Sequence, residues 1–165
     1  MRAAVQGVVA LAVLAVLALG ARGDCEEEIP LSKVPKKVMS AVKAKYPGAD
    51  LRGAVKGIED KEVYYTISLT YKKDELEVSL SPKGEISEVA KEIAVKDLPR
   101  AVSEAVLKKY PKATLTEAAE VREPDEKGKL SYHVELTTAD KKTMEIELDP
   151  KGAILKEKET KEDKK

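Results

Sequence analysis

The sequence predicts an α+β protein built from two tandem units. Each unit is a helix followed by an antiparallel meander, and both helices pack on one face of a joined antiparallel sheet. Three observations predict this fold class. The phrase "KYPGADL" at 45–51 returns as "KYPKATL" at 109–115, each phrase ends a stretch with helical spacing of apolar residues, and each is followed by stretches in which apolar and polar residues alternate. One structural unit used twice accounts for all three observations.

The two predicted helices share one apolar stripe. Apolar residues stand at i, i+4, i+7, i+8 and i+12, counted first from Val34 and again from Leu98, which is one face of a helix. Pro35 and Pro99 fall in the first turn, where the missing N–H costs nothing. Asp97 is the N-cap candidate of the second helix. Both helices are expected to end at a Tyr-Pro pair, because proline disfavours helical geometry in the residue before it.

Four strands are expected in each unit, because the apolar period drops to two after each helix. They lie at 50–58, 62–71, 75–81 and 85–92, and then at 113–122, 130–138, 142–149 and 153–158. "SPKG" at 81–84 and "DPKG" at 149–152 suit type I turns, with glycine free to adopt positive φ. The offset between the halves grows from 64 in the helices to 68 at these turns, so insertions fall in loops, chiefly in "EPDEKGK" at 123–129. We therefore expect a first repeat at 31–92, a second at 93–158, and a charged disordered tail at 159–165.

The first 23 residues differ in kind from the rest. A short positive start, the apolar run "VVALAVLAVLAL" at 8–19 and small residues before Asp24 predict a secretory signal peptide at 1–23. The run is too short for a typical membrane helix, so we expect no membrane span after cleavage. A lipid anchor at Cys25 is disfavoured, because Asp24 stands where such sites have a small residue. Residues 24–30 are expected to be a mobile segment, and the mature chain to be secreted or periplasmic.

The composition disfavours several classes of function. With 30 basic and 30 acidic residues the chain has no basic field to hold nucleic acid. His133 is the only histidine and Cys25 the only cysteine, which is too few for a zinc site or a typical nucleophile-histidine pair. The glycines stand singly rather than in a phosphate-binding loop. We therefore predict no catalytic, cofactor-binding or metal-binding residues, and no cofactor.

The solvent-facing side of the joined sheet is the candidate site. The alternation places hydroxyls and carboxylates on this side, opposite the apolar residues that face the helices. The alternative interpretation is that this side of the sheet is a plain solvated surface. For the lysine-rich face of the first helix, a solvated surface is the interpretation that we prefer. The residues we predict for a protein-binding face are Tyr64, Thr66, Ser68, Glu77, His133, Glu135, Glu145 and Glu147, with Thr70, Glu75 and Thr137 beside them.

The second half resembles the bacterial PepSY-like domains, which are also described as beta-lactamase-inhibitor-like. The resemblance rests on "LPRAVSEAVLKKYPKATL" and "YHVELTTADKKTMEIELDPKGAIL", within 95–156, and 31–89 repeats it in weaker form. It implies a secreted or periplasmic α+β domain, often in tandem, with a role in protein binding or enzyme inhibition. Beta-lactamase inhibitory proteins grip the enzyme with the open face of two joined sheets. This chain lacks their disulfides and has no Trp or Phe to anchor an interface, which argues against nanomolar inhibition of a beta-lactamase.

Two functional hypotheses remain open. The first is a non-enzymatic binding module that presents its sheet face, or a sheet edge, to a protein partner and inhibits or regulates an envelope or extracellular enzyme. The second is a small-ligand or cation-sensing module of the envelope that uses the acidic face. A weak hydrolase is the least favoured reading. The sequence names neither the partner nor the oligomeric state.

Overall fold

The computed structural model describes residues 26–59, 61–124 and 128–160, which form two helices and one nine-stranded antiparallel sheet with its strands in sequence order. The predicted fold class is therefore confirmed. The helices are α1 (Lys36–Lys45) and α2 (Arg100–Lys109), preceded by the 3-10 turns η1 (Leu31–Lys33) and η2 (Val95–Asp97). The strands are β1 (Glu27–Ile29), β2 (Asp50–Glu59), β3 (Glu62–Tyr71), β4 (Asp74–Leu80), β5 (Ile86–Glu92), β6 (Thr114–Glu123), β7 (Lys129–Thr137), β8 (Thr143–Leu148) and β9 (Ile154–Thr160).

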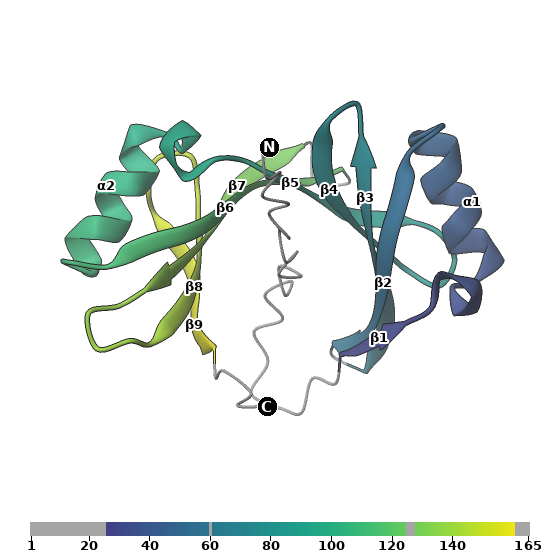
Figure 1. The fold of residues 1–165 in the computed structure, drawn as a ribbon, viewed down its shortest axis with the longest axis horizontal. Helices are drawn as coiled ribbons and strands as arrows, with labels where there is room; N and C mark the ends of the chain where they lie inside the picture. Colours follow the sequence, from purple (N-terminus) through teal and green to yellow (C-terminus); the bar gives the residue numbers. More distant parts are fainter. Residues whose placement is uncertain (1–25, 60, 125–127, 161–165) are drawn as a thin grey trace, which may run out of the picture.

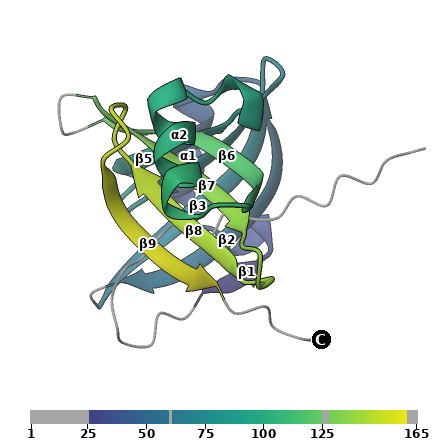
Figure 2. The ribbon, with the colours of Figure 1, turned by 90° about the vertical axis from the view of Figure 1, so that its left-hand side faces the viewer.

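The sheet is arched, and both helices lie on its outer, convex side (Figure 1). α1 covers one arm of the arch and α2 covers the other, while β5 lies near the crown (Figure 1). Seen from the side, α2 lies across the strands of its own repeat (Figure 2). Among the described residues, no helix lies on the inner, concave side (Figure 1).

Each helix seals a separate apolar core against the convex side. Val38 and Val42 of α1 are fully buried with residues of β3 and β4, and Val102 and Val106 of α2 are buried in the same way on β7 and β8. β-branched side chains suit this role on the strands, and on the helices they occupy the expected apolar stripe. The repeat visible in the sequence is therefore a repeat of helix-on-sheet cores.

The two repeats join edge to edge through β5 and β6. Ala90 pairs with Val121 and Glu92 pairs with Ala119 across this junction. Bulges recur at matching positions, at Leu51/Gly53 and Leu115/Glu117, and again in β4 and β8. Such bulges bend strands and increase their twist, which helps to explain why the joined sheet arches rather than lies flat.

The hairpin turns before β5 and β9 are built as the sequence predicts. Gly84 has φ +88° and Gly152 has φ +86°, and their N–H groups donate to Ser81 O at 2.9 Å and Asp149 O at 3.0 Å. Each glycine lies against the first turn of its helix. A Cβ on Gly84 would lie 2.8 Å from the carbonyl oxygen of Lys37, and one on Gly152 would overlap that of Ala101 more closely still.

The helix ends agree with the sequence only in part. Tyr46 and Tyr110 follow the last helical residues and donate their backbone N–H at 2.8 Å to the carbonyl four residues earlier. Asp97, however, is not an N-cap. It lies within η2, and the N-cap of α2 is Pro99, with no side-chain capping bond. Leu98 and Pro99 separate Asp97 from the first residue of α2, Arg100.

Two boundary predictions are wrong. Residues 24–30, expected to be mobile, contain β1, whose residues Glu27–Ile29 pair with β2. Residues 159 and 160, which the prediction assigned to the tail at 159–165, belong to β9, because this strand runs to Thr160. Ile29 of β1 packs against the first core, whereas the end of β9 is polar and is held by backbone pairing to β8, which needs no apolar side chain. The predictions for 1–23 and Cys25, and for the tail at 161–165, lie outside the described residues.

Candidate functional site

The concave face is the surface made by the strand residues that point away from the helices. Its members alternate with the core residues along every strand from β2 to β9 and are matched across the strands by the pairing register. All eight predicted site residues lie on it. Its members in β3 to β8 are Glu62, Tyr64, Thr66, Ser68, Thr70, Glu75, Glu77, Ser79, Glu88, Ala90, Glu92, Thr114, Glu117, Ala119, Val121, Glu123, Lys129, Ser131, His133, Glu135, Thr137, Thr143, Glu145 and Glu147.

The first repeat lines the concave face with hydroxyls that contact carboxylates. Thr66 and Ser79 share a hydrogen bond of 3.0 Å between their hydroxyls. The Ser68 hydroxyl donates to Oε1 of Glu77 at 3.4 Å, and Thr70 donates to Glu75 at 3.0 Å. These cross-strand pairs stabilise the register while keeping the face polar.

Tyr64 lies at the border of the concave face and is fixed from two sides. Its hydroxyl donates to Oε1 of Glu26 at 2.5 Å. Its ring lies over Gly57, its partner on β2, so closely that a Cβ at that position would overlap the ring. Gly57 thus permits a tyrosine to lie flat on the sheet.

The second repeat places charged pairs where the first has hydroxyls. His133 pairs with Glu147 across β7 and β8, and Oε2 of Glu147 lies 3.8 Å from Nζ of Lys156 on β9. Glu135 pairs with Glu145 and accepts a hydrogen bond of 2.9 Å from the Thr116 hydroxyl. The register makes Glu147, rather than Glu135 or Glu145, the direct neighbour of His133 on β8.

The concave face is much less exposed than the alternation predicted. The relative exposure of His133 is 7%, that of Glu145 is 8% and that of Glu147 is 6%, and Thr66 and Ser68 are buried as well. Curvature explains this, because side chains on the inner side of an arch converge. Reading His133 as an ordinary surface residue is therefore wrong.

Burial shifts the pKa values of the buried ionisable groups toward their neutral forms. Burial raises the pKa of Glu77 to about 7 and that of Glu88 to about 7, with neighbouring carboxylates adding to the effect. Burial also raises the pKa of Glu117 and Glu145. The pKa of His133 is lowered, chiefly by burial, so that its imidazole is mainly neutral at pH 7. The concave face is thus acidic, and two of its carboxyl groups, Glu77 and Glu88, have pKa values close to neutral pH.

Sequence reasoning missed the central residues of the concave face. Glu88, Ala90 and Glu92 on β5 face the same side as Glu77, and Ala119 and Val121 on β6 continue that surface across the junction. Ala90, Ala119 and Val121 form a small buried apolar cluster of their own. The alternation in "EISEVAKE" at 85–92 predicts the strand β5. Which of its residues point into the concave face, however, follows only from the pairing of β4 with β5.

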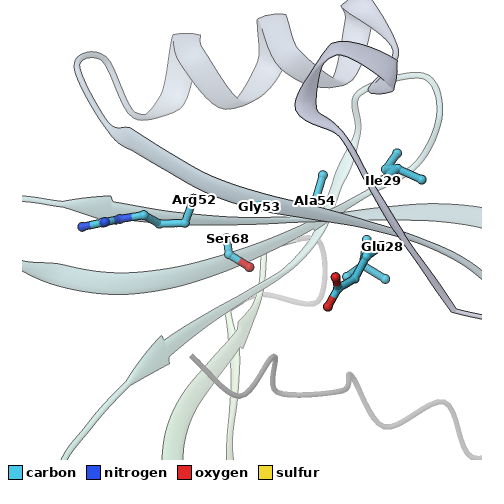
Figure 3. Close-up of a pocket in the computed structure, with 7 residues that line it drawn as sticks. Glu28, Ile29, Arg52, Gly53, Ala54 and Ser68 are labelled. Carbon is cyan, nitrogen blue, oxygen red and sulfur yellow. The ribbon is translucent and has the colours of Figure 1, made fainter. Parts of the chain in front are cut away.

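Two hollows flank the concave face. The first, of about 260 Å³, lies where β1, β2 and β3 meet, beside the Gly53 bulge. There Glu28 and Ser68 point away from α1, while Ile29 and Ala54 point toward it (Figure 3). The second, of about 230 Å³, is lined by Glu59, Tyr64, Ser79, Ser87, Glu88 and Glu123.

Within residues 26–59, 61–124 and 128–160, no group of three or more His, Cys, Asp or Glu side chains is placed to hold a metal ion. In the same residues no helix is long and apolar enough to cross a membrane.

These features define a class: a two-repeat α+β protein with one continuous arched sheet, helices on the convex side and an uncovered acidic concave side. The chain belongs to the family described as "putative beta-lactamase-inhibitor-like, PepSY-like", whose model matches residues 24–88 and again 71–156. The two matches agree with a tandem repeat, and the resemblance seen in the sequence is confirmed. No curated protein matches the chain.

Solved structures from Bacteroides species share the fold. A DUF2874 family protein from Bacteroides uniformis has a TM-score of 0.62 and 21% identity, over 76% of this chain and 88% of that one. A BLIP-like protein from Bacteroides fragilis has a TM-score of 0.58 and 22% identity, over 83% and 93%. A putative periplasmic protein from Bacteroides eggerthii has a TM-score of 0.61 and 19% identity, over 76% and 88%. At these identities the likeness is one of fold.

Proposed function

We propose that this chain is a secreted or periplasmic binding module without catalytic activity. It presents its concave face to a protein partner, and it inhibits or regulates an envelope or extracellular enzyme by doing so. The observation that carries the proposal is the continuous concave face itself, which spans both repeats and which no helix covers in the part of the chain that the structure describes (Figure 1).

The chemistry of the face supports binding over catalysis. Its only histidine is buried, has a lowered pKa and has Ala119 and Glu147, rather than a serine or cysteine, as cross-strand neighbours. The family description and the name of the Bacteroides fragilis neighbour, a BLIP-like protein, point in the same direction.

Site-specific photo-crosslinking tests which surface meets the partner. A photoreactive amino acid is placed at Glu135 on the concave face and, in a matched control, at Leu107 of α2, which is 45% exposed on the convex side. The mature chain is then irradiated in the envelope and culture fluid of the producing cell. We expect one dominant crosslinked protein from position 135 and none from position 107. Crosslinking of the same protein through position 107 alone would reject the concave face.

The alternative, a small-ligand or cation-sensing module, makes a different prediction. Calorimetric titration with Ca²⁺ would then release or absorb heat and raise the melting temperature. Our proposal predicts neither effect.

A further inference from the structure

Two glycines of β2 lie at concave positions. Gly57 pairs with Tyr64 and Gly53 pairs with Ser68, both on β3, so each glycine is on the side of the sheet that faces away from the helices. A glycine within a strand exposes the backbone and lets another group approach it closely. Among the described residues, the chain itself covers Gly57 and leaves Gly53 uncovered.

The place above Gly57 is filled by a tyrosine. The Tyr64 ring lies over Gly57 so closely that a Cβ at this glycine would overlap the ring. The Tyr64 hydroxyl donates to Oε1 of Glu26, the residue before β1, at 2.5 Å. The arrangement therefore has two parts: a ring on a bare strand backbone, and a hydroxyl bonded to a glutamate beside the edge strand.

The place above Gly53 has no such cover. Among the described residues, no atom other than those of its chain neighbours lies within 4 Å of the position that a Cβ would take. Ser68 stands beside Gly53 as Tyr64 stands beside Gly57, and its side chain is too short to cover the glycine. The result is the first of the two hollows, of about 260 Å³. It is smaller than the pockets of about 300–1,000 Å³ that hold drug-sized ligands, so it suits a single side chain.

The walls of this hollow complement a tyrosine. Val55 provides apolar surface, and Glu28 and Arg52 stand at the two ends, where both are exposed to solvent (Figure 3). Among the described residues, the Glu28 carboxylate makes no hydrogen bond or ion pair, so it is available to accept from a phenol hydroxyl. Arg52 contacts Thr70 and Asp50 through Nε, which leaves its terminal N–H groups to contact the face of a ring.

The second repeat differs at the matching position. β6 has a bulge there as β2 does, but Glu117 stands in the place of Gly53. Thr116 stands in the place of Arg52, and its hydroxyl donates to Glu135 at 2.9 Å. The chain's own side chains therefore occupy this position in the second repeat, whereas the first repeat keeps it open.

We propose that the protein partner of the concave face places a tyrosine ring on Gly53, in the way that Tyr64 lies on Gly57. The tyrosine hydroxyl donates to the Glu28 carboxylate, and Arg52 lies against the ring. Aromatic side chains seated in pockets contribute much of the binding energy of many interfaces, and this chain has no Trp or Phe of its own. The inference rests on the proposed function and names the chemistry of the partner's anchor.

Short peptides test the inference without knowledge of the partner. The probe is a blocked Gly-Tyr-Gly peptide, and its controls carry phenylalanine or leucine in place of tyrosine. Binding to the mature chain is measured by NMR titration. We expect saturable binding of the tyrosine peptide, roughly threefold weaker binding of the phenylalanine peptide because it lacks the hydroxyl, and no saturable binding of the leucine peptide. The ring current should shift the amide signal of Gly53 and the methyl signals of Val55 upfield.

Variants of Gly53 fill the hollow from within. Gly53 has no positive φ and has open space around it, so a side chain fits there without strain. Gly53→Glu copies Glu117 of the second repeat and should abolish binding of the probe. Gly53→Ala should weaken binding at least about threefold, because a Cβ holds the ring away from the backbone. Gly53→Ala should not lower the melting temperature, which separates a filled hollow from a misfolded chain.

Two further variants locate the contacts of the tyrosine. Glu28→Ala should remove the advantage of the tyrosine peptide over the phenylalanine peptide, whereas Glu27→Ala, on the opposite side of β1, should keep it. Arg52→Gln should weaken binding of both aromatic peptides about twofold to fivefold, as expected for an exposed cation beside a ring. Arg122→Gln, on the convex side of β6, is the matched control and should leave binding unchanged.

Four outcomes would overturn the inference: no saturable binding of the tyrosine peptide, equal binding of the leucine peptide, unchanged binding in Gly53→Glu, or an unchanged preference for tyrosine in Glu28→Ala. Failure of the proposed function looks different. If position 135 crosslinks a partner whose affinity is unaffected by Gly53→Glu, the concave face is the binding surface and the tyrosine anchor is rejected. If the peptide binds as described but no crosslink forms at position 135, the tyrosine site stands and the proposed function fails.

Discussion

Gly84 and Gly152, in the hairpin turns before β5 and β9, allow each turn to lie close to the first turn of its helix. Gly84 and Gly152 combine a positive φ with a close approach to a helix carbonyl, so two separate physical reasons require glycine at each. Gly48 has φ +79° but no atom within 4 Å of the place a Cβ would occupy. The chain therefore contains its own control for separating backbone strain from steric overlap.

We expect Gly152→Ala to be the most destabilising of the three alanine substitutions. Gly48→Ala should cost about 1 kcal/mol through its left-handed backbone alone. Gly152→Ala adds an overlap with Ala101 O and should cost about 3 kcal/mol or more, with Gly84→Ala between the two. Urea unfolding gives the three free energies. Equal losses at positions 48 and 152 would show that the turn does not press against α2.

The buried glutamates of the concave face make stability depend on pH. The folded state raises the pKa of Glu77 to about 7 from a usual 4.5, so the folded chain holds this proton more tightly than the unfolded chain does. The contribution of Glu77 to stability is therefore most favourable below pH 4.5 and is lost as the pH rises toward 7. Glu88 acts in the same direction.

Glu77→Gln should reduce the loss of folding stability that occurs as the pH rises. Between pH 5 and pH 8 the free energy of unfolding of the variant should fall less than that of the original chain, by on the order of 1–3 kcal/mol. Urea unfolding at the two pH values measures the difference. Glu104→Gln serves as the control, because its carboxylate is exposed on α2. An unchanged difference between pH 5 and pH 8 would mean that Glu77 is ionised normally in the folded chain.

At the scale of elements, the sequence predicted helices and strands correctly wherever the pattern of apolar and polar residues follows their burial. The stripe that starts at Val34 and the alternation along 62–71 predicted α1 and β3 closely. The end of β9 was missed because backbone pairing holds its polar residues, and β1 was missed because its one apolar residue, Ile29, forms no pattern that predicts a strand. The same limit applies to the site. Tyr64 and Glu77 could be placed on a face from alternation alone, but Ala90 and Val121 belong to it through register and curvature.

At the scale of the molecule, the two repeats form one sheet and divide its two sides by chemistry. The convex side holds two apolar cores under the helices, and the concave side gathers carboxylates from both repeats around a small apolar centre. The repeats differ most between the equivalent strands β5 and β9, because β5 carries Glu88 and Ala90 where β9, at the edge of the sheet, carries Lys156 and Lys158. The strand β5 therefore lacks the two lysines that β9 places beside the carboxylates of the second repeat.

The central claim is that a protein partner binds the concave face. The most direct test is methyl NMR of the mature chain with the protein identified by crosslinking. The account predicts that the methyl signals of Ala90, Ala119 and Val121 shift on binding, while those of Leu107 on the convex side stay in place. Shifts at Leu107 with no change at Ala90, Ala119 and Val121 would contradict it.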